Sequence, residues 1–157
     1  MGADVHDRIV ARWAATAEEA AVSHGVLALV LAPASLMDVA RSLKADFGFD
    51  MLLDITAVDW PEREPRFDVV YHFYSTRDFV RVRLKTRVPV AAPSVATLVP
   101  LYNSARFAER ECHEMYGIEF RGNDDLRPIL LYEGFVGHPL RKDYPKQAEQ
   151  PLVPYRT

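Results

Sequence analysis

The sequence predicts an α+β fold, in which N-terminal helices pack on a mostly antiparallel sheet and an irregular, proline-rich C-terminal arm follows. Three observations lead to this prediction. Apolar residues recur at helical spacing in the N-terminal third of the chain. The middle holds short runs rich in β-branched and aromatic residues, one of which alternates strictly between apolar and basic side chains. From residue 118 onward no period holds and five prolines interrupt the chain.

Two helices and two strands are expected before the middle of the chain. Residues 6–23 show helical spacing, with Gly25 as a stop, at Ile9, Trp13, Ala17, Ala20 and Ala21. The short apolar run 26–31 is typical of a buried strand. A second helix, ending near Gly48, is marked by Leu36, Val39, Ala40, Leu43 and Phe47. A strand from about Leu52 to Trp60 follows, and the turn 61–65 contains two prolines.

Residues 67–75 and 79–88 predict a β-hairpin closed around 76–78. Because successive side chains of a strand point to opposite faces, one face of the second strand is apolar and the other carries Arg81, Arg83, Lys85 and Arg87. Such cations can follow a phosphate backbone, or they can cover a solvent face and discourage edge-to-edge aggregation. The face lacks interleaved aromatic residues for base stacking. We therefore expect no nucleic-acid partner, and favour a docking surface for an acidic protein.

Composition limits the chemistry of the chain. With 157 residues, 49% of them apolar, and a net charge of −3, the sequence predicts one folded unit without polycation character. The single cysteine, Cys112, excludes an internal disulfide and an all-cysteine iron–sulfur cluster, and indicates a reducing, intracellular compartment. Residues 1–7 do not resemble a signal peptide. The longest apolar run, 26–34, is far below the roughly 20 residues that span a bilayer, so membrane contact is expected only through partners.

Common catalytic motifs are missing from the sequence. His113-Glu114 begins like a zinc-binding H-E-x-x-H motif, but Gly117 stands at the second histidine position. The sequence has no Gly-rich dinucleotide or phosphate loop and no Gly-x-Ser-x-Gly elbow. We therefore expect no catalytic residue, no cofactor-binding residue and no metal ligand in this chain.

A third helix, from about Tyr102 to Tyr116 with a stop at Gly117, carries the most informative pattern. Its expected buried seam consists of Leu101, Ala105, Ala108, Cys112 and Met115. Glu109 and Glu111 then flank the seam, while Arg110 and Glu114 lie on the outer face. Carboxylates at the edge of a buried seam need cationic or N–H partners, here expected among Arg121, Arg127, Arg141 and Lys142. The carboxylates could be catalytic acids, but an ion network that pins the C-terminal segment to this helix explains them more simply.

Three stretches resemble one protein family: Glu109-Arg-Glu-x-x-Glu114-Met-Tyr-Gly117-Ile, Gly122-x-x-Asp125-Leu-Arg127-x-Ile-Leu130 and Gly137-x-Pro-Leu-Arg-Lys-Asp-Tyr-Pro145. The stretches Asp54-Ile-Thr-Ala-Val-Asp-Trp-Pro61 and Arg66-Phe-Asp-Val-Val-Tyr71 look like the central strands of the same family. The family is the 30 kDa subunit of NADH:quinone oxidoreductase, respiratory complex I. The resemblance covers roughly residues 50–146. Asn123-Asp124 stands where the family usually has His-Pro.

The resemblance implies a non-catalytic subunit in the peripheral arm of a proton-translocating NADH:quinone oxidoreductase, on the cytoplasmic side of the cell membrane. Flavin, iron–sulfur clusters and quinone would be held by partner subunits. This chain would position the neighbouring partner whose surroundings form the quinone pocket, which we call the quinone-site subunit. Residues 1–117 would form the α+β domain, and 118–157 an extended arm packing on a partner.

Structural or interface roles, with no part in catalysis, are expected for Glu109, Arg110, Glu111, Glu114, Tyr116, Gly117, Arg127, Arg141, Lys142 and Asp143. The alternative function is that of the equivalent subunit of a membrane-bound hydrogenase or of a ferredoxin-driven plastoquinone reductase.

Overall fold

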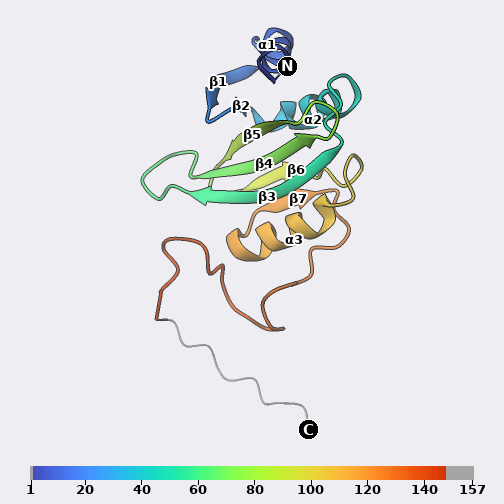
Figure 1. The fold of residues 1–157 in the computed structure, drawn as a ribbon. Helices are drawn as coiled ribbons and strands as arrows, with labels where there is room; N and C mark the ends of the chain where they lie inside the picture. The colour runs from blue at the N-terminus through green and yellow to red at the C-terminus, as the bar shows by residue number, and fades with distance from the viewer. Residues whose placement is uncertain (1, 148–157) are drawn as a thin grey trace.

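A computed structural model describes residues 2–147 of the chain (Figure 1). Within this range the helices are α1 (Gly2–Trp13), α2 (Leu36–Ala45) and α3 (Ala105–Tyr116), and a 3-10 turn precedes α2 at Pro33–Ser35. The main sheet consists of β1 (Ala17–Ser23), β2 (Val26–Leu31), β3 (Met51–Asp59), β4 (Phe67–Ser75) and β5 (Val80–Val88). Its strand order is β1-β2-β5-β4-β3. Only the β2–β5 pair is parallel among its neighbours, so the α+β prediction with a mostly antiparallel sheet is confirmed.

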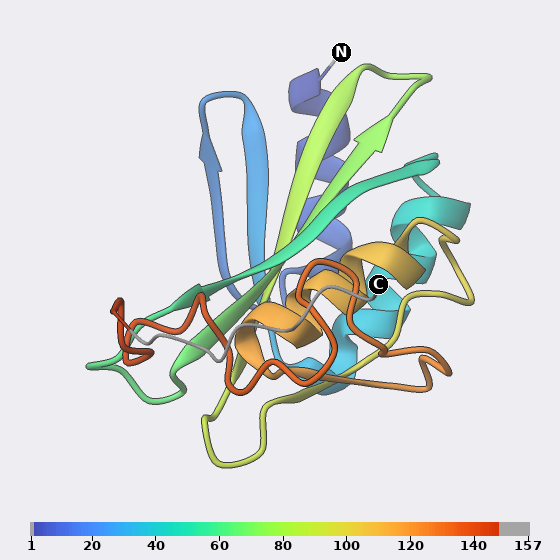
Figure 2. The same cartoon turned by 90° about the horizontal axis from the view of Figure 1, so that it is seen from below.

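One face of the main sheet is packed and the other is open. Alternate residues of β5, from Val80 to Val88, are buried, as the strict alternation of the sequence predicts. They join one core with apolar residues of all three helices, among them Ile9, Leu43 and Cys112. Figure 2 shows the three helices on the same side of the twisted sheet. The opposite face therefore carries the cations of β5.

The predicted helix over residues 6–23 is wrong in its second half. The helix ends at Trp13, and residues 17–23 form β1, which pairs with β2. His24 and Gly25 both have positive φ, of 51° and 75°, which is the backbone of a two-residue hairpin turn. Six of the seven residues of β1 are exposed, so its helix-favouring alanines and glutamates bury nothing. Hydrogen bonding to the edge of β2 overrides that local preference.

The remaining predicted elements up to Gly117 are present, with small shifts at their ends. The proposed role of the β5 cations in protecting a sheet edge is wrong, because β5 lies in the centre of the sheet, where there is no edge to protect. Pro89 and Pro93 end the main sheet as expected. A second, two-stranded parallel sheet then follows, made of β6 (Ser94–Ala96) and β7 (Glu119–Arg121).

The irregular segment begins at Gly122 and not at residue 118. Ile118 and Phe120 are fully buried in the core, and β7 is too short for a period to be detected in the sequence. Residues 122–147 contain no helix or strand, and we call them the C-terminal segment. The last ten residues of the expected arm, 148–157, lie outside the described residues.

Candidate functional site

Helix α3 and the C-terminal segment form the region in which the sequence places its candidate residues. The predicted seam is confirmed: Ala105, Cys112 and Met115 are buried, and Ala108 is half-buried. In Figure 1 the C-terminal segment runs along the side of α3 that faces away from the sheet. Helix and segment therefore have to be described together.

Glu109 is fully buried and is held by neutral donors. Its carboxylate accepts hydrogen bonds from the Thr97 hydroxyl (2.6 Å), the Leu98 backbone N–H (2.7 Å) and the Asn123 side-chain amide (2.9 Å). Burial raises the pKa of Glu109, and these three hydrogen bonds oppose that rise. The expected ion pair with a cation of residues 121–142 is therefore wrong for Glu109, since its acceptor capacity is taken by donors that link β6, α3 and the start of the C-terminal segment.

Glu114, predicted on the outer face of the helix, is in fact only 7% exposed. The C-terminal segment folds over it and donates three backbone N–H groups to its carboxylate, from Ile129 (3.3 Å), Leu130 (2.9 Å) and Leu131 (2.9 Å). A helical wheel cannot anticipate this burial, because a distant irregular stretch supplies the cover. The contact is a carboxylate–amide cradle and not an ion pair.

Arg110 holds the same stretch from another position on the helix. Its guanidinium donates to the carbonyls of Arg127 (2.9 Å) and Pro128 (3.0 Å) and lies 3.7 Å from Asp125. Arg127 itself points to solvent and pairs with Asp125, which holds the pKa of that carboxyl well below its ordinary range. Glu111 is exposed and makes no hydrogen bond or ion pair with residues 2–147, so the part of the predicted ion network assigned to it is not present there.

A second set of contacts fixes the end of the C-terminal segment to the main sheet. Arg66 donates to both carboxylate oxygens of Asp59 (2.7 and 2.8 Å) and also to Asp143 (2.8 Å). Asp59 is buried and further accepts the backbone N–H of Lys142 at 2.7 Å. Arg66 is the main cause that lowers the pKa of Asp59 and of Asp143. Of the predicted contact residues, Lys142 and Asp143 are thus placed against β3 and the turn that precedes β4.

Gly117 closes helix α3 where the C-terminal segment returns. Its φ of 72° is left-handed, and the side chains of His138 and Arg141 occupy the space that a Cβ atom would need. Arg141 donates to the Tyr116 carbonyl at 2.6 Å, and the His138 ring Nδ1 contacts the Glu114 carbonyl at 2.9 Å. Tyr116 is half-buried, and burial is the main cause that raises its pKa.

Sequence reasoning missed four residues of this region: Asp59, Arg66, Thr97 and Asn123. Asp59 and Arg66 lie within family-like stretches, which is the one signal that pointed to them. Thr97 and Asn123 gave no signal, because their contacts with Glu109 depend on how β6 and β7 pair. The carboxylates of Glu109 and Glu114 are occupied by internal donors. The region can therefore fix a segment in place, whereas proton transfer to a ligand would need the acceptor positions that these donors fill.

The structure offers little for metal or nucleophile chemistry. Among residues 2–147 no group of three or more His, Cys, Asp or Glu side chains is arranged to hold a metal ion. The Cys112 thiol is free and buried, and burial raises its pKa, which keeps it protonated. Within the described residues no helix is both long and apolar enough to cross a membrane.

Exposed apolar side chains are concentrated in one half of the molecule, built from β3, α3 and the C-terminal segment (Figure 1). Among residues 2–147, thirteen large apolar side chains are exposed, and only Val22, Phe79 and Val90 lie elsewhere. We call the other ten the apolar half: Met51, Leu53, Val58, Trp60, Phe107, Ile129, Leu130, Tyr132, Val136 and Leu140. A concentration of this kind is typical of a surface that another protein covers.

Comparison with known proteins identifies the family. Residues 29–150 match the family described as respiratory-chain NADH dehydrogenase, 30 kDa subunit. The chain is 46% identical over 126 residues to the corresponding subunit of the NADH-quinone oxidoreductase of Agrobacterium fabrum, and covers 62% of that protein with 79% of its own length. It is 40% identical over 138 residues to the corresponding subunit of the Geobacter sulfurreducens enzyme, where the match covers 87% of this chain and 85% of the relative.

Two solved structures share the fold. A trypsin-resistant fragment of Nqo5 superimposes with a TM-score of 0.69 at 30% identity, over 80% of this chain and all of that one. A chain of the membrane-bound sulfane sulfur reductase, an archaeal respiratory membrane complex, superimposes with a TM-score of 0.81 at 27% identity. That match covers 93% of this chain and 86% of the other.

Proposed function

The chain belongs to the family of the 30 kDa subunit of respiratory-chain NADH dehydrogenase, and from this premise we propose that it is a non-catalytic subunit in the peripheral arm of a proton-translocating NADH:quinone oxidoreductase. Its role is to position the quinone-site subunit. Flavin, iron–sulfur clusters and quinone are held by partner subunits in this proposal. The chain is held at the cytoplasmic side of the cell membrane by those partners.

The observation that carries the proposal is the apolar half. Ten exposed apolar side chains in one half of a small protein favour a permanent protein contact, since burying apolar area contributes about 25 cal/mol per Å². Several of them, such as Leu130 and Tyr132, lie in the C-terminal segment, which the Glu114 carboxylate and Arg66 hold in place. A segment ordered before docking loses less conformational entropy when the partner binds. This supports a subunit whose contribution is shape.

A second candidate is the equivalent subunit of a related membrane complex that uses another electron donor. The likeness to a chain of the archaeal sulfane sulfur reductase favours it, because that match covers 93% of this chain with a TM-score of 0.81. Purification of the native complex separates the two candidates. An NADH-oxidising flavin subunit in the complex supports the first, and its absence together with a different donor subunit supports the second.

The docking role is tested with a matched pair of substitutions. Phe107→Asp places a charge in the apolar half, whereas Phe79→Asp places the same charge at the tip of the β4–β5 hairpin, outside it. Both phenylalanines are exposed, so neither change disturbs the core. We expect Phe107→Asp to reduce the amount of the quinone-site subunit that co-purifies with the chain from native membranes, and Phe79→Asp to leave it unchanged. Equal retention of that partner in both variants would contradict the proposal.

A further inference from the structure

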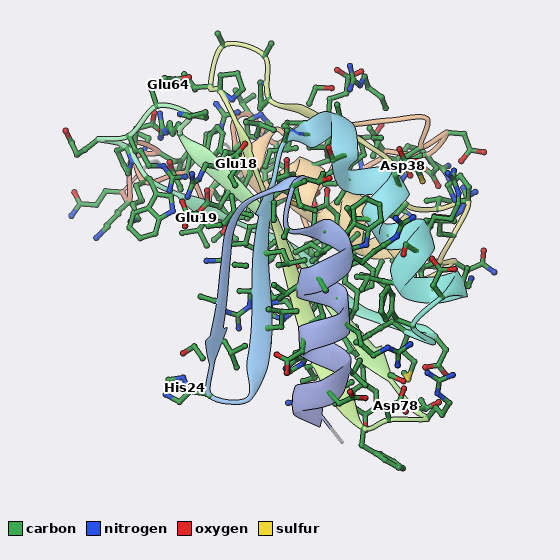
Figure 3. The ribbon with its side chains drawn as sticks, turned by 90° about the horizontal axis from the view of Figure 1, so that it is seen from above. Glu18, Glu19, His24, Asp38, Glu64 and Asp78 are labelled. Carbon is green, nitrogen blue, oxygen red and sulfur yellow. The ribbon has the colours of Figure 1, made fainter. Side chains whose placement is uncertain are left out.

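The open face of the main sheet carries cations that the chain itself does not neutralise. Arg87 pairs with Glu19 at 2.6 Å, with Glu18 at 3.6 Å and with Asp68 at 3.8 Å. Figure 3 shows Glu18 and Glu19 at the end of β1 that is distant from His24, so this compensation is confined to one end of the face. The three remaining cations are Arg81, Arg83 and Lys85, which we call the basic row.

Members of the basic row have no carboxylate partner among residues 2–147. The Arg81 guanidinium lies over the Tyr74 ring, 5.8 Å from its centroid. Arg83 and Lys85 make no hydrogen bond or ion pair with the described part of the chain, and the Arg83 Nε atom is buried without an acceptor. A buried donor without an acceptor costs free energy, and an incoming acceptor would remove that cost.

The surface around the basic row is low and apolar. Across to β2, Arg81 is paired with Val26, Arg83 with Ala28 and Lys85 with Val30. Val30 is almost fully buried although no helix covers this face, which the long stems of the neighbouring cations explain. The charged ends of the row thus rise above a floor of small side chains, where an extended chain can lie flat.

The positive field of the basic row extends to the next strand. His72 of β4 is paired with Arg83, and burial lowers its pKa. The charges of Arg83 and Arg81 lower it further, while Asp54, opposite His72 on β3, raises it. One nearby carboxylate therefore does not offset the row.

The spacing of the row indicates what would bind. Alternate residues of a strand project to the same face about 6.7 Å apart, from the rise of about 3.3 Å per residue. An extended peptide with carboxylates at every second residue has the same repeat. Nucleic acid fits less well, because the aromatic ring of Tyr74 is already covered by Arg81 and the chain carries a net charge of −3.

We propose that the basic row docks an extended acidic segment of another subunit of the same complex, with Asp or Glu at alternate positions. The inference rests on the proposed function, since it needs the chain to work within an assembly. It adds a second surface on the face of the sheet opposite the helices. The chain would then lie between two partners and fix the distance between them.

The test is zero-length coupling of amines to carboxylates in the native membrane complex. Lys85 should couple to an Asp or Glu of another subunit, and this product should be missing in the Lys85→Arg variant, which keeps the charge but has no reactive amine. Acetylation of Lys85 by a small amine-reactive reagent should proceed in the isolated chain and be lost in the complex. Lys44 of α2, away from the basic row, is the control for general reactivity.

Three results would overturn the inference. Lys85 could be acetylated equally in the complex and in the isolated chain, or couple only to carboxylates of its own chain, or become reactive when the complex is treated with nuclease. Lys142 and Lys146, in the C-terminal segment, report on the proposed function separately. If these two lose acetylation in the complex while Lys85 does not, the docking of the apolar half stands and the basic row has no partner.

Discussion

Strand β1 and the C-terminal segment differ in opposite ways from what regular structure suggests. β1 is a regular strand, yet it is exposed on both faces and is paired to β2 alone within the main sheet. Residues 122–147 have no helix or strand, yet they donate to a buried carboxylate at Glu114 and are bridged to Asp59 through Arg66. The comparison teaches that buried polar contacts, more than backbone regularity, decide which part of this molecule is held firmly.

The largest effect is expected at Glu109, where the core meets the start of the C-terminal segment. Glu109→Ala leaves the Leu98 N–H and the Asn123 amide without their acceptor and opens a cavity. We expect it to lower the free energy of unfolding by about 3–5 kcal/mol, measured by urea denaturation. Glu109→Gln, which keeps one acceptor oxygen, should cost about 1–2 kcal/mol. A loss in the alanine variant no larger than that of the glutamine variant would contradict the role given to the buried carboxylate.

A smaller and more local effect is expected at Glu114. Glu114→Ala removes the acceptor of the Leu130 and Leu131 amides, so the C-terminal segment should detach from α3. We expect a cost of about 2 kcal/mol, because water can reach part of the freed amides. Hydrogen exchange of these two amides should be slow in the wild-type isolated chain and fast in the variant. Fast exchange in both proteins would show that the segment is not anchored before docking.

The pH dependence follows from the two carboxyls that Arg66 holds, Asp59 and Asp143. Their folded-state pKa values lie below the ordinary value, so their contribution is complete above about pH 4 and is lost as the pH falls through the lowered pKa values. Thermal unfolding between pH 5 and pH 2 should therefore lose stability less steeply in an Asp59→Asn variant than in the wild type. Parallel curves for the two proteins would exclude Asp59 as a source of acid sensitivity.

The smallest effect is expected in β1. Glu19→Gln breaks the 2.6 Å pair with Arg87, but both side chains are partly in water. Exposed pairs of this kind contribute below about 1 kcal/mol, so urea denaturation should show a change within about 0.5 kcal/mol. A cost equal to that of Glu114→Ala would remove the distinction between the two regions.

Most of the fold was open to prediction from the sequence, because β2 to β5, α2 and the end of α3 bury a face whose spacing is visible in the residues. β1 was not, since Ala17 to Ser23 bury almost nothing and their helical spacing carried no information about packing. At the site, the seam of Cys112 and Met115 could be predicted from α3 alone. The burial of Glu114 could not, because the cover comes from residues 129–131, and neither could the partners of Glu109, which depend on a three-residue strand pair.

The most direct test of the docking role is hydroxyl-radical footprinting of the isolated chain and of the intact native complex. Oxidation of Phe107, Leu130 and Tyr132 should fall in the complex, because the apolar half is covered there, while Phe79, at the tip of the β4–β5 hairpin, should be oxidised equally in both. If Phe107, Leu130 and Tyr132 are oxidised to the same extent in the complex as in the isolated chain, this half of the molecule has no role in positioning a neighbour.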